Sequence, residues 1–234
     1  MLQNNLTKML AAALVVAPMC GCSVDSLKDA ANFASSSGTE AKKTTVDVEA
    51  VSLTGAKLVA SYAVAMAGVT EAQSDLAKAF NLDDLANELE TQKTALKSGN
   101  LTSDDAEKVV ELSEKANEAI EEKMKEQTEL DAQAKKKVGS ALVKYSVGTA
   151  GTAMLINTAK NVVTDTSSYI ASLPWSQRAG ALSGDMTVAL NVAKEIPSLT
   201  KNLISTGNSF VEYASAQGID VKKAKSEMSK AAGF

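Results

Sequence analysis

From Val48 onward, apolar residues recur at alternating steps of three and four, and this spacing restricts the possible folds more than any other feature of the chain. Such spacing marks one face of an α-helix. Only Gly55 and Gln73 are off type in the first stretch, which comprises Val48, Val51, Gly55, Leu58, Tyr62, Met66, Val69, Gln73, Leu76 and Phe80. Thr45 or Asp47 can cap its start. The predicted helix has about 33 residues and is about 50 Å long.

Further helices are predicted downstream. Asn81 ends the first helix, and a second runs from Asp83 or Asp84 to about Lys97, where Gly99 follows as a stop signal. Thr102 begins a third segment, whose three-four spacing continues through Tyr145 and could extend to about Ser172. A kink or break is expected within it at Gly139, Gly148 and Gly151, because each glycine weakens a helix by up to ~1 kcal/mol.

Prolines divide the C-terminal part of the chain. Leu173 precedes Pro174 and therefore marks a turn. A helix is predicted from about 176 to 195, with Pro197 ending or kinking it, and Ser198 capping another helix to about 216. Gln217-Gly218 terminates that helix, and Asp220 begins a short tail helix. The single tryptophan, Trp175, is interpreted as a core residue at the turn in preference to an exposed interface anchor.

The sequence has no tight hairpin signal and no sustained period-two pattern, so no strand is predicted. The expected fold is all-α, a mostly antiparallel bundle of long helices over residues 46–234. Two uncharged segments rich in small residues, Leu58–Thr70 and Tyr145–Ala159, are expected to pack together at its centre, since each has glycine near its middle, Gly68 in the first and Gly148 and Gly151 in the second. The alternatives are an apolar ligand cavity or a membrane-inserting segment, although each run is too short to span a bilayer.

The composition restricts the possible chemistry. The chain has no histidine and two cysteines, Cys20 and Cys22. Histidine triads and His/Cys zinc sites are therefore excluded, and no serine-nucleophile motif is present. The acidic run from Glu107 to Glu129 is interpreted as a solvated face, because di-iron bundles require a Glu-x-x-His motif. With a net charge of −4, no basic face for nucleic acid is evident. We expect a non-enzymatic protein without metal or cofactor.

The N-terminus has the layout of a secretory signal. Lys8 precedes an eleven-residue apolar run, Met9 to Met19, which is about 16 Å long as a helix and too short to cross a membrane. Met19-Cys20-Gly21-Cys22 resembles the lipobox of bacterial lipoprotein precursors, over residues 1–24 only. The resemblance implies a signal peptide at 1–21 and acyl chains such as palmitate on Cys22. It also implies sorting to the outer membrane, because Ser23 and not Asp follows.

The N-terminal sequence leaves two alternatives open, and the function leaves a third. Cys20 competes with Cys22 for the lipid, although Gly21 favours Cys22, and an ordinary cleaved signal without lipid is the second alternative. Residues 22–45 are expected to form a flexible tether. The favoured function is a lipid-anchored structural or interaction protein of the cell envelope, facing the periplasm or the cell surface, with an envelope protein as partner. The third alternative is a carrier or sensor of an apolar ligand. A closed apolar cavity of at least ~300 Å³ would indicate this carrier, whereas a solid core with an exposed apolar patch would indicate the interaction protein.

Overall fold

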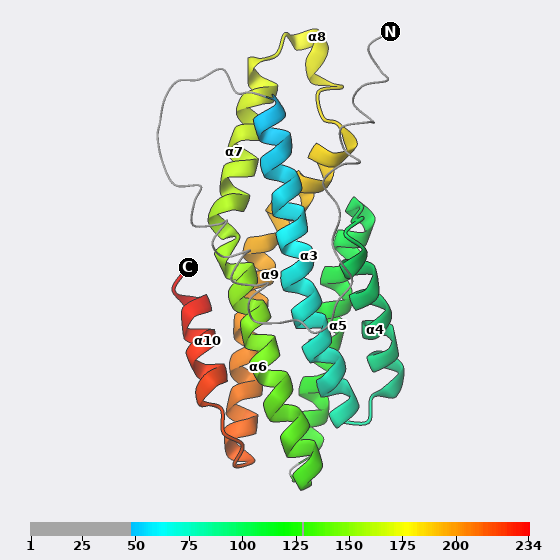
Figure 1. Ribbon diagram of the computed structural model, residues 1–234, viewed down its shortest axis with the longest axis vertical. Helices are drawn as coiled ribbons and strands as arrows, with labels where there is room; N and C mark the ends of the chain where they lie inside the picture. The colour runs from blue at the N-terminus through cyan, green and yellow to red at the C-terminus, as the bar shows by residue number, and fades with distance from the viewer. Residues whose placement is uncertain (1–47, 128) are drawn as a thin grey trace.

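The computed structural model describes residues 48–127 and 129–234, which fold as a helical bundle without strands in those ranges (Figure 1). The all-α prediction is confirmed. Most successive helices run antiparallel, whereas α7 continues in the direction of α6 (Figure 1). The helices are α3 Val48–Ala79, α4 Asp83–Ser98, α5 Ser103–Glu126, α6 Ala132–Met154, α7 Ile156–Ser172, α8 Trp175–Arg178, α9 Gly184–Ala216 and α10 Lys222–Ala232.

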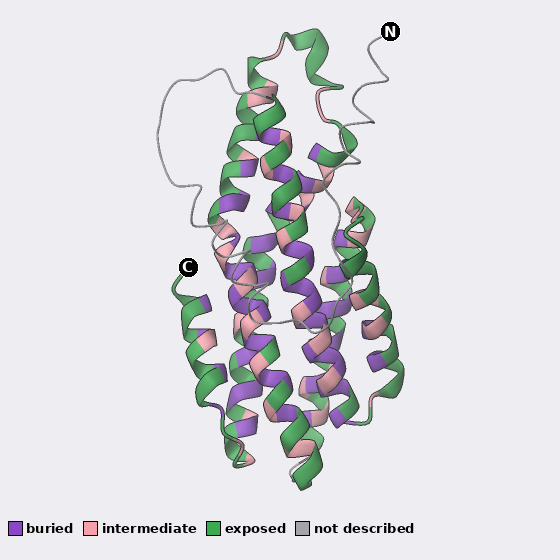
Figure 2. Cartoon of the chain, in the orientation of Figure 1, coloured by how far each residue is buried: buried purple, intermediate pink, exposed green. Residues whose placement is uncertain are grey.

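The central element is α3, which packs against α4, α5, α6, α7 and α9. Its predicted apolar face is buried from Val51 to Phe80 (Figure 2). Gly55, one of its two off-type positions, lies where α9 crosses closely, since a Cβ there would lie 2.8 Å from Cβ of Ala189. By length and composition α3 could cross a membrane, and among the helices described here it alone meets that test. Its burial by five neighbours identifies it as a core helix.

The predicted boundaries around α4 and the start of α5 are confirmed. Gly99 ends α4 in the left-handed conformation, with φ of 75°. Thr102 then caps α5 through a reciprocal capping box: its hydroxyl accepts a hydrogen bond from the N–H of Asp105 at 3.2 Å, and the Asp105 carboxylate accepts one from the N–H of Thr102 at 3.1 Å.

The prediction for the third helical segment was wrong in where it breaks. The chain leaves helical geometry after Glu126, and α6 begins at Ala132, whereas Gly139, Gly148 and Gly151 all lie within α6. Asp131 ends the intervening loop as an N-cap, its carboxylate accepting a hydrogen bond from the N–H of Ala134 at 2.7 Å.

Contacts with α9 stabilise this loop. The Tyr213 hydroxyl donates to the carbonyl of Gln127 at 2.9 Å, and the N–H of Leu130 donates to the Gln217 side chain at 3.1 Å. A second break falls at Leu155, between α6 and α7. Contacts with residues far away in the sequence therefore determine where this segment breaks, and the three-four spacing of apolar residues gives no information about them.

Two predictions for the C-terminal part are also corrected. No long helix begins at 176; α8 is a single turn, and α9 begins at Gly184 after Ser183 as N-cap. Pro197 lies inside α9 and does not end it. Proline removes one backbone hydrogen bond, and the burial of Ile196 and Leu199 beside it keeps the helix continuous. Gly218, with φ of 74°, ends the turn after α9 as expected.

The predicted contact between the two small-residue segments is confirmed on α3 and α6. A Cβ at Gly68 would lie 3.8 Å from the Cα of Gly148. At Gly148 a Cβ would lie 2.7 Å from Cγ2 of Val69 and 2.8 Å from its backbone nitrogen. Gly148 therefore sets how closely the two helix axes approach.

Two ends of the bundle differ in construction. At one end lie the N-terminal half of α3, α7, α8 and the N-terminal half of α9 (Figure 1). At the other end the chain turns between α3 and α4, between α5 and α6, and between α9 and α10 (Figure 1). We call the first the α8 end and the second the opposite end.

Candidate functional site

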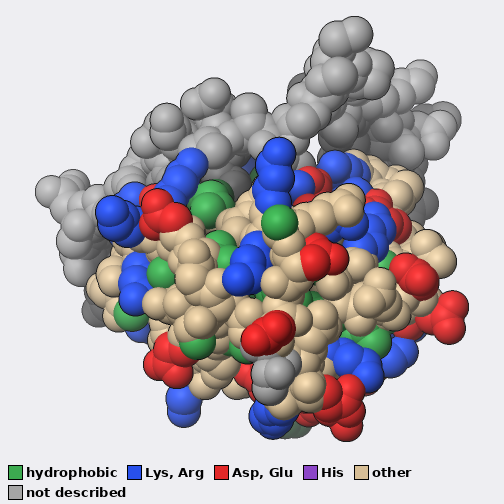
Figure 3. All heavy atoms as spheres, turned by 90° about the horizontal axis from the view of Figure 1, so that it is seen from below, with side chains coloured by type: hydrophobic (Ala, Val, Ile, Leu, Met, Phe, Trp, Pro, Cys, Tyr) green, Lys and Arg blue, Asp and Glu red, His purple; other side chains and the backbone are tan. Residues whose placement is uncertain are grey.

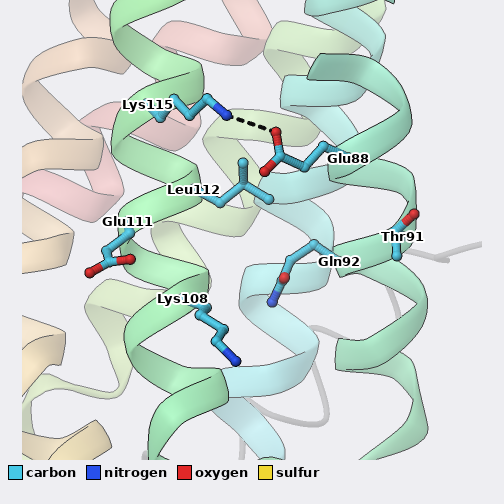
Figure 4. Close-up of a pocket in the computed structure, with 7 residues that line it drawn as sticks. All are labelled: Glu88, Thr91, Gln92, Lys108, Glu111, Leu112 and Lys115. Atoms are coloured by element: carbon cyan, nitrogen blue, oxygen red, sulfur yellow. Dashed lines mark hydrogen bonds and ion pairs between the residues drawn. The ribbon is translucent and has the colours of Figure 1, made fainter. Parts of the chain in front are cut away.

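A shallow groove lies between α4 and α5 (Figure 4), with a volume of about 490 Å³. Leu112 is the apolar residue of its lining, and Lys115 donates to the Glu88 carboxylate at 2.8 Å across the groove. Lys115 on α5 thus pairs with a residue of α4. The lining residues are Glu88, Thr91, Gln92, Lys108, Glu111, Leu112 and Lys115.

The groove is suited to a polar surface contact. Its acidic and basic side chains are exposed and of both signs, so they create no strong field of one sign. A neighbouring hollow of about 370 Å³ beside the α3–α4 turn shares Glu88 and Lys115 and is likewise open to solvent. Neither is the closed apolar cavity that a carrier of apolar ligands requires.

A buried polar cluster joins α3, α5 and α6. The amide nitrogen of Gln73 donates to the carbonyl and the hydroxyl of Ser113, both at 2.9 Å, and to the Asn117 side-chain oxygen at 2.8 Å. The Tyr145 hydroxyl donates to the same Asn117 oxygen at 3.3 Å. Burial raises the pKa of the Tyr145 hydroxyl, so it remains a protonated donor.

The role of this cluster is structural. Gln73 is fully buried, and its side-chain oxygen has no hydrogen-bond partner. A buried polar network fixes how neighbouring helices align, because any shift leaves donors and acceptors unpaired. The off-type Gln73 was its sequence signal, but the sequence did not show that Asn117 and Tyr145 would meet it.

The α8 end exposes large apolar side chains. Trp175 is 85% exposed, Leu53 56% and Val48 43%. The prediction that Trp175 fills the core was wrong. It lies on α8, at the tip where α7 turns back into α9 (Figure 1), and none of the residues of α8 is buried.

Arg178 fixes the tip that carries Trp175. Its guanidinium donates to the carbonyl of Leu173 at 3.0 Å and to that of Ala171 at 2.9 Å. These carbonyls lie at the C-terminal end of α7, where helix carbonyls lack internal partners and a cation is favourable. The position of α8 is therefore defined by hydrogen bonds, which sequence reasoning did not anticipate.

The tip around α8 carries little charge, although exposed charges of both signs, including Glu49, Lys57, Asp165 and Asp185, lie elsewhere at this end of the bundle. From residue 166 to 184 the chain carries a single charge, Arg178. The opposite end, viewed in Figure 3, presents acidic and basic side chains across its surface with apolar side chains scattered between them. Exposed acids there include Asp83, Asp84 and Asp220.

The acidic residues of α5 and the lipidation residue Cys22 are the other candidates that the sequence offered. The acids of α5 lie mostly on its exposed face, with Glu121 half-buried. Over residues 48–127 and 129–234, no group of three or more acidic side chains converges as a metal site would require. Cys22, the candidate lipidation residue, lies outside the described residues, as do the expected signal peptide and tether.

No known protein family, curated protein or solved structure matches this chain.

Proposed function

We propose that this chain is a non-enzymatic structural or interaction protein of the bacterial cell envelope, anchored to the outer membrane by lipid on Cys22. The observation that carries the interaction role is a buried hydrophobic core combined with exposed apolar side chains at the α8 end, where Trp175 is 85% exposed and either a membrane or a protein could be contacted. Exposed apolar surface on an otherwise polar bundle is typical of an interaction site. The anchor is supported by Gly21-Cys22 after a short apolar run.

A role as carrier of apolar ligands is less well supported. The small-residue helices that would line its cavity pack directly on one another, since a Cβ added at Gly68 would lie 3.8 Å from the Cα of Gly148. Insertion of α3 into a membrane would expose the polar groups of Gln73 and Ser74 on its buried face to lipid. Both the ligand carrier and the membrane-inserting protein would also require α3 to separate from the helices that pack against it.

Within this proposal the α4–α5 groove is the surface that binds an envelope protein. Its charges are balanced and its hydrogen-bonding groups exposed, as in the polar part of a reversible interface. Neither this groove nor the α8 end is a uniformly basic surface, so neither favours nucleic acid.

The anchor is tested by comparing Cys22→Ser with Cys20→Ser in cells given labelled palmitate. We expect Cys22→Ser to abolish labelling and to release the protein from the outer-membrane fraction, because one modified cysteine supplies the attachment. Cys20→Ser serves as the matched control and should remain labelled. If Cys22→Ser remains labelled and Cys20→Ser does not, the lipid is on Cys20. If both variants remain labelled, neither cysteine alone carries the lipid and the proposed anchor is contradicted.

The interaction role is tested by placing a photo-crosslinking residue at Thr91 in the groove or at Thr164 on the exposed face of α7. A protein partner at the groove should give the same crosslinked product from Thr91 in repeated preparations and none from Thr164. Mass spectrometry of lipids released from the purified protein provides the second readout. A stoichiometric bound lipid without any protein crosslink would contradict the interaction role and support the carrier.

A further inference from the structure

The α8 end and the start of the described chain lie on the same side of the molecule. Val48, the first residue of α3, is at the end of the bundle that carries Trp175 (Figure 1). Any attachment at Cys22 therefore reaches the folded bundle from this end. Position 48 follows position 22 by 26 residues (48 − 22 = 26).

The tether expected from the sequence would place the anchor near the α8 end. A connection of 26 residues with the flexibility that its sequence predicts has an r.m.s. end-to-end distance of about 28 Å, whereas α9, with 33 residues, is about 50 Å long. The opposite end is thus beyond the average reach of the anchor. Tethering also raises the effective concentration of lipid at the α8 end, so a weak contact there becomes populated.

The chemistry of the tip suits a lipid headgroup layer. Tryptophan is enriched at membrane–water interfaces, where its large apolar ring and its N–H are both satisfied. Trp175 is exposed on a turn that Arg178 ties to α7 through two hydrogen bonds. Arg178 is also the single charge between residues 166 and 184, and a cation is compatible with anionic phospholipid.

From these observations we infer that the α8 end docks on the phospholipid surface that carries the anchored Cys22, with Trp175 at the level of the headgroups. This inference rests on the proposed lipid anchor. The bundle then stands with its long axis away from the membrane. The opposite end, with exposed Asp83, Asp84 and Asp220, faces the aqueous compartment.

The experiment uses Trp175 as its own reporter, because it is the single tryptophan of the chain. Full-length lipidated protein is reconstituted into vesicles of phosphatidylethanolamine and phosphatidylglycerol, some of whose acyl chains are brominated close to the headgroup. We expect the emission of Trp175 to shift to shorter wavelength and to be quenched by the bromolipid. The matched control is Trp175→Phe combined with Lys136→Trp, which moves the reporter to an exposed position at the opposite end and should be neither shifted nor quenched.

Flotation of the same vesicles separates the inference from the anchor. Protein that floats without quenching at Trp175 overturns membrane docking and leaves the anchor intact. Quenching from both reporter positions overturns the upright orientation. Protein that does not float overturns the anchor and the inference together. If the emission of Trp175 shifts only after an envelope protein is added, and not with vesicles alone, the inference is also overturned.

A second measurement uses unlipidated protein. In the Cys22→Ser background, vesicle binding depends on the tip alone, and Trp175→Ala should weaken it by ~10-fold or more, since it removes most of the apolar area that enters the interface. Phe234→Ala, after the end of α10, removes another exposed aromatic side chain (54% exposed) and should leave vesicle binding unchanged. Equal binding by the Trp175→Ala protein would overturn the assignment of Trp175.

Discussion

Gly148 is the position at which one added methyl group tests the packing of the whole bundle. In Gly148→Ala, the new Cβ would lie 2.7 Å from Cγ2 of Val69, 2.8 Å from the Val69 backbone nitrogen and 3.1 Å from the carbonyl oxygen of Ala65. Two of these three atoms belong to the backbone of α3. A rotamer change of Val69 therefore cannot relieve the clash, and the axes of α3 and α6 must move apart.

The expected loss in the free energy of unfolding follows from two opposed terms. Overpacking a filled core costs about 1–3 kcal/mol, and replacing glycine by alanine within a helix returns up to ~1 kcal/mol. Because two of the clashing atoms are backbone, the cost should fall in the upper part of its range, at about 2–3 kcal/mol, and the net loss is about 1–2 kcal/mol. For a domain of this size it corresponds to a fall in Tm of about 2–8 °C. Thermal unfolding followed by circular dichroism at 222 nm measures it.

Gly184→Ala is the matched control for this prediction. Gly184 is the first residue of α9, and a Cβ there would have no heavy atom within 4 Å. The same chemical change should raise Tm slightly, because alanine restricts the unfolded chain. A rise in Tm for Gly148→Ala as well would refute the close approach of α3 and α6. Gly148→Ala combined with Val69→Ala should lose less stability than the sum of the two single variants, because the nearest contact is removed while the cost of deleting the buried methyl groups of Val69 remains.

Three further predictions concern polar groups. Asp131→Ala removes the N-cap of α6 and should cost about 1 kcal/mol, or about 2–4 °C in Tm; an unchanged Tm would show that the cap is dispensable. Asn117→Ala leaves the buried Tyr145 hydroxyl without an acceptor and should cost about 1–3 kcal/mol in urea unfolding, and adding Tyr145→Phe should recover part of that cost. The pKa of the Glu90 carboxyl is lowered to about 2, chiefly by the hydrogen bond from Lys93. Because the pKa of the folded state lies below the ordinary 4.5, the Glu90 contribution to stability is present above pH 4.5 and is lost as pH falls toward 2. Glu90→Gln should therefore reduce the difference between urea midpoints measured at pH 6 and pH 3, and an unchanged difference would contradict this role.

Where local chemistry decides, the sequence predicted the fold well. The start of α5 at Thr102 and the end of α4 at Gly99 follow from side-chain and backbone preferences within a few residues. The predictions failed where distant segments decide. Asp131 lies within the stretch that was predicted as one continuous helix, yet it caps a new helix beside a loop stabilised by α9. Pro197 was expected to divide a helix that burial keeps continuous.

The candidate surfaces were less predictable than the core. The exposure of Trp175 depends on which helices cover the turn between α7 and α9, and no local pattern encodes that. The groove of α4 and α5 likewise forms through the pairing of Lys115 with Glu88, from different helices. The off-type Gln73 did signal a buried polar contact, but its partners Ser113 and Asn117 lie 40 and 44 residues away along the chain.

The central position of α3 has a consequence for how the chain is synthesised. α3 is the first helix of the described chain to emerge, whereas two of its packing partners, α6 and α9, end at Met154 and Ala216. At ordinary rates of ribosomal elongation, the apolar face of α3 remains without its partner α9 for on the order of 10–30 s. During that interval α3 is a 32-residue apolar helix with the length and composition of a membrane span. Nascent chains arrested before α9 should therefore bind holding chaperones more strongly than full-length chains, and equal chaperone capture of both lengths would contradict this consequence.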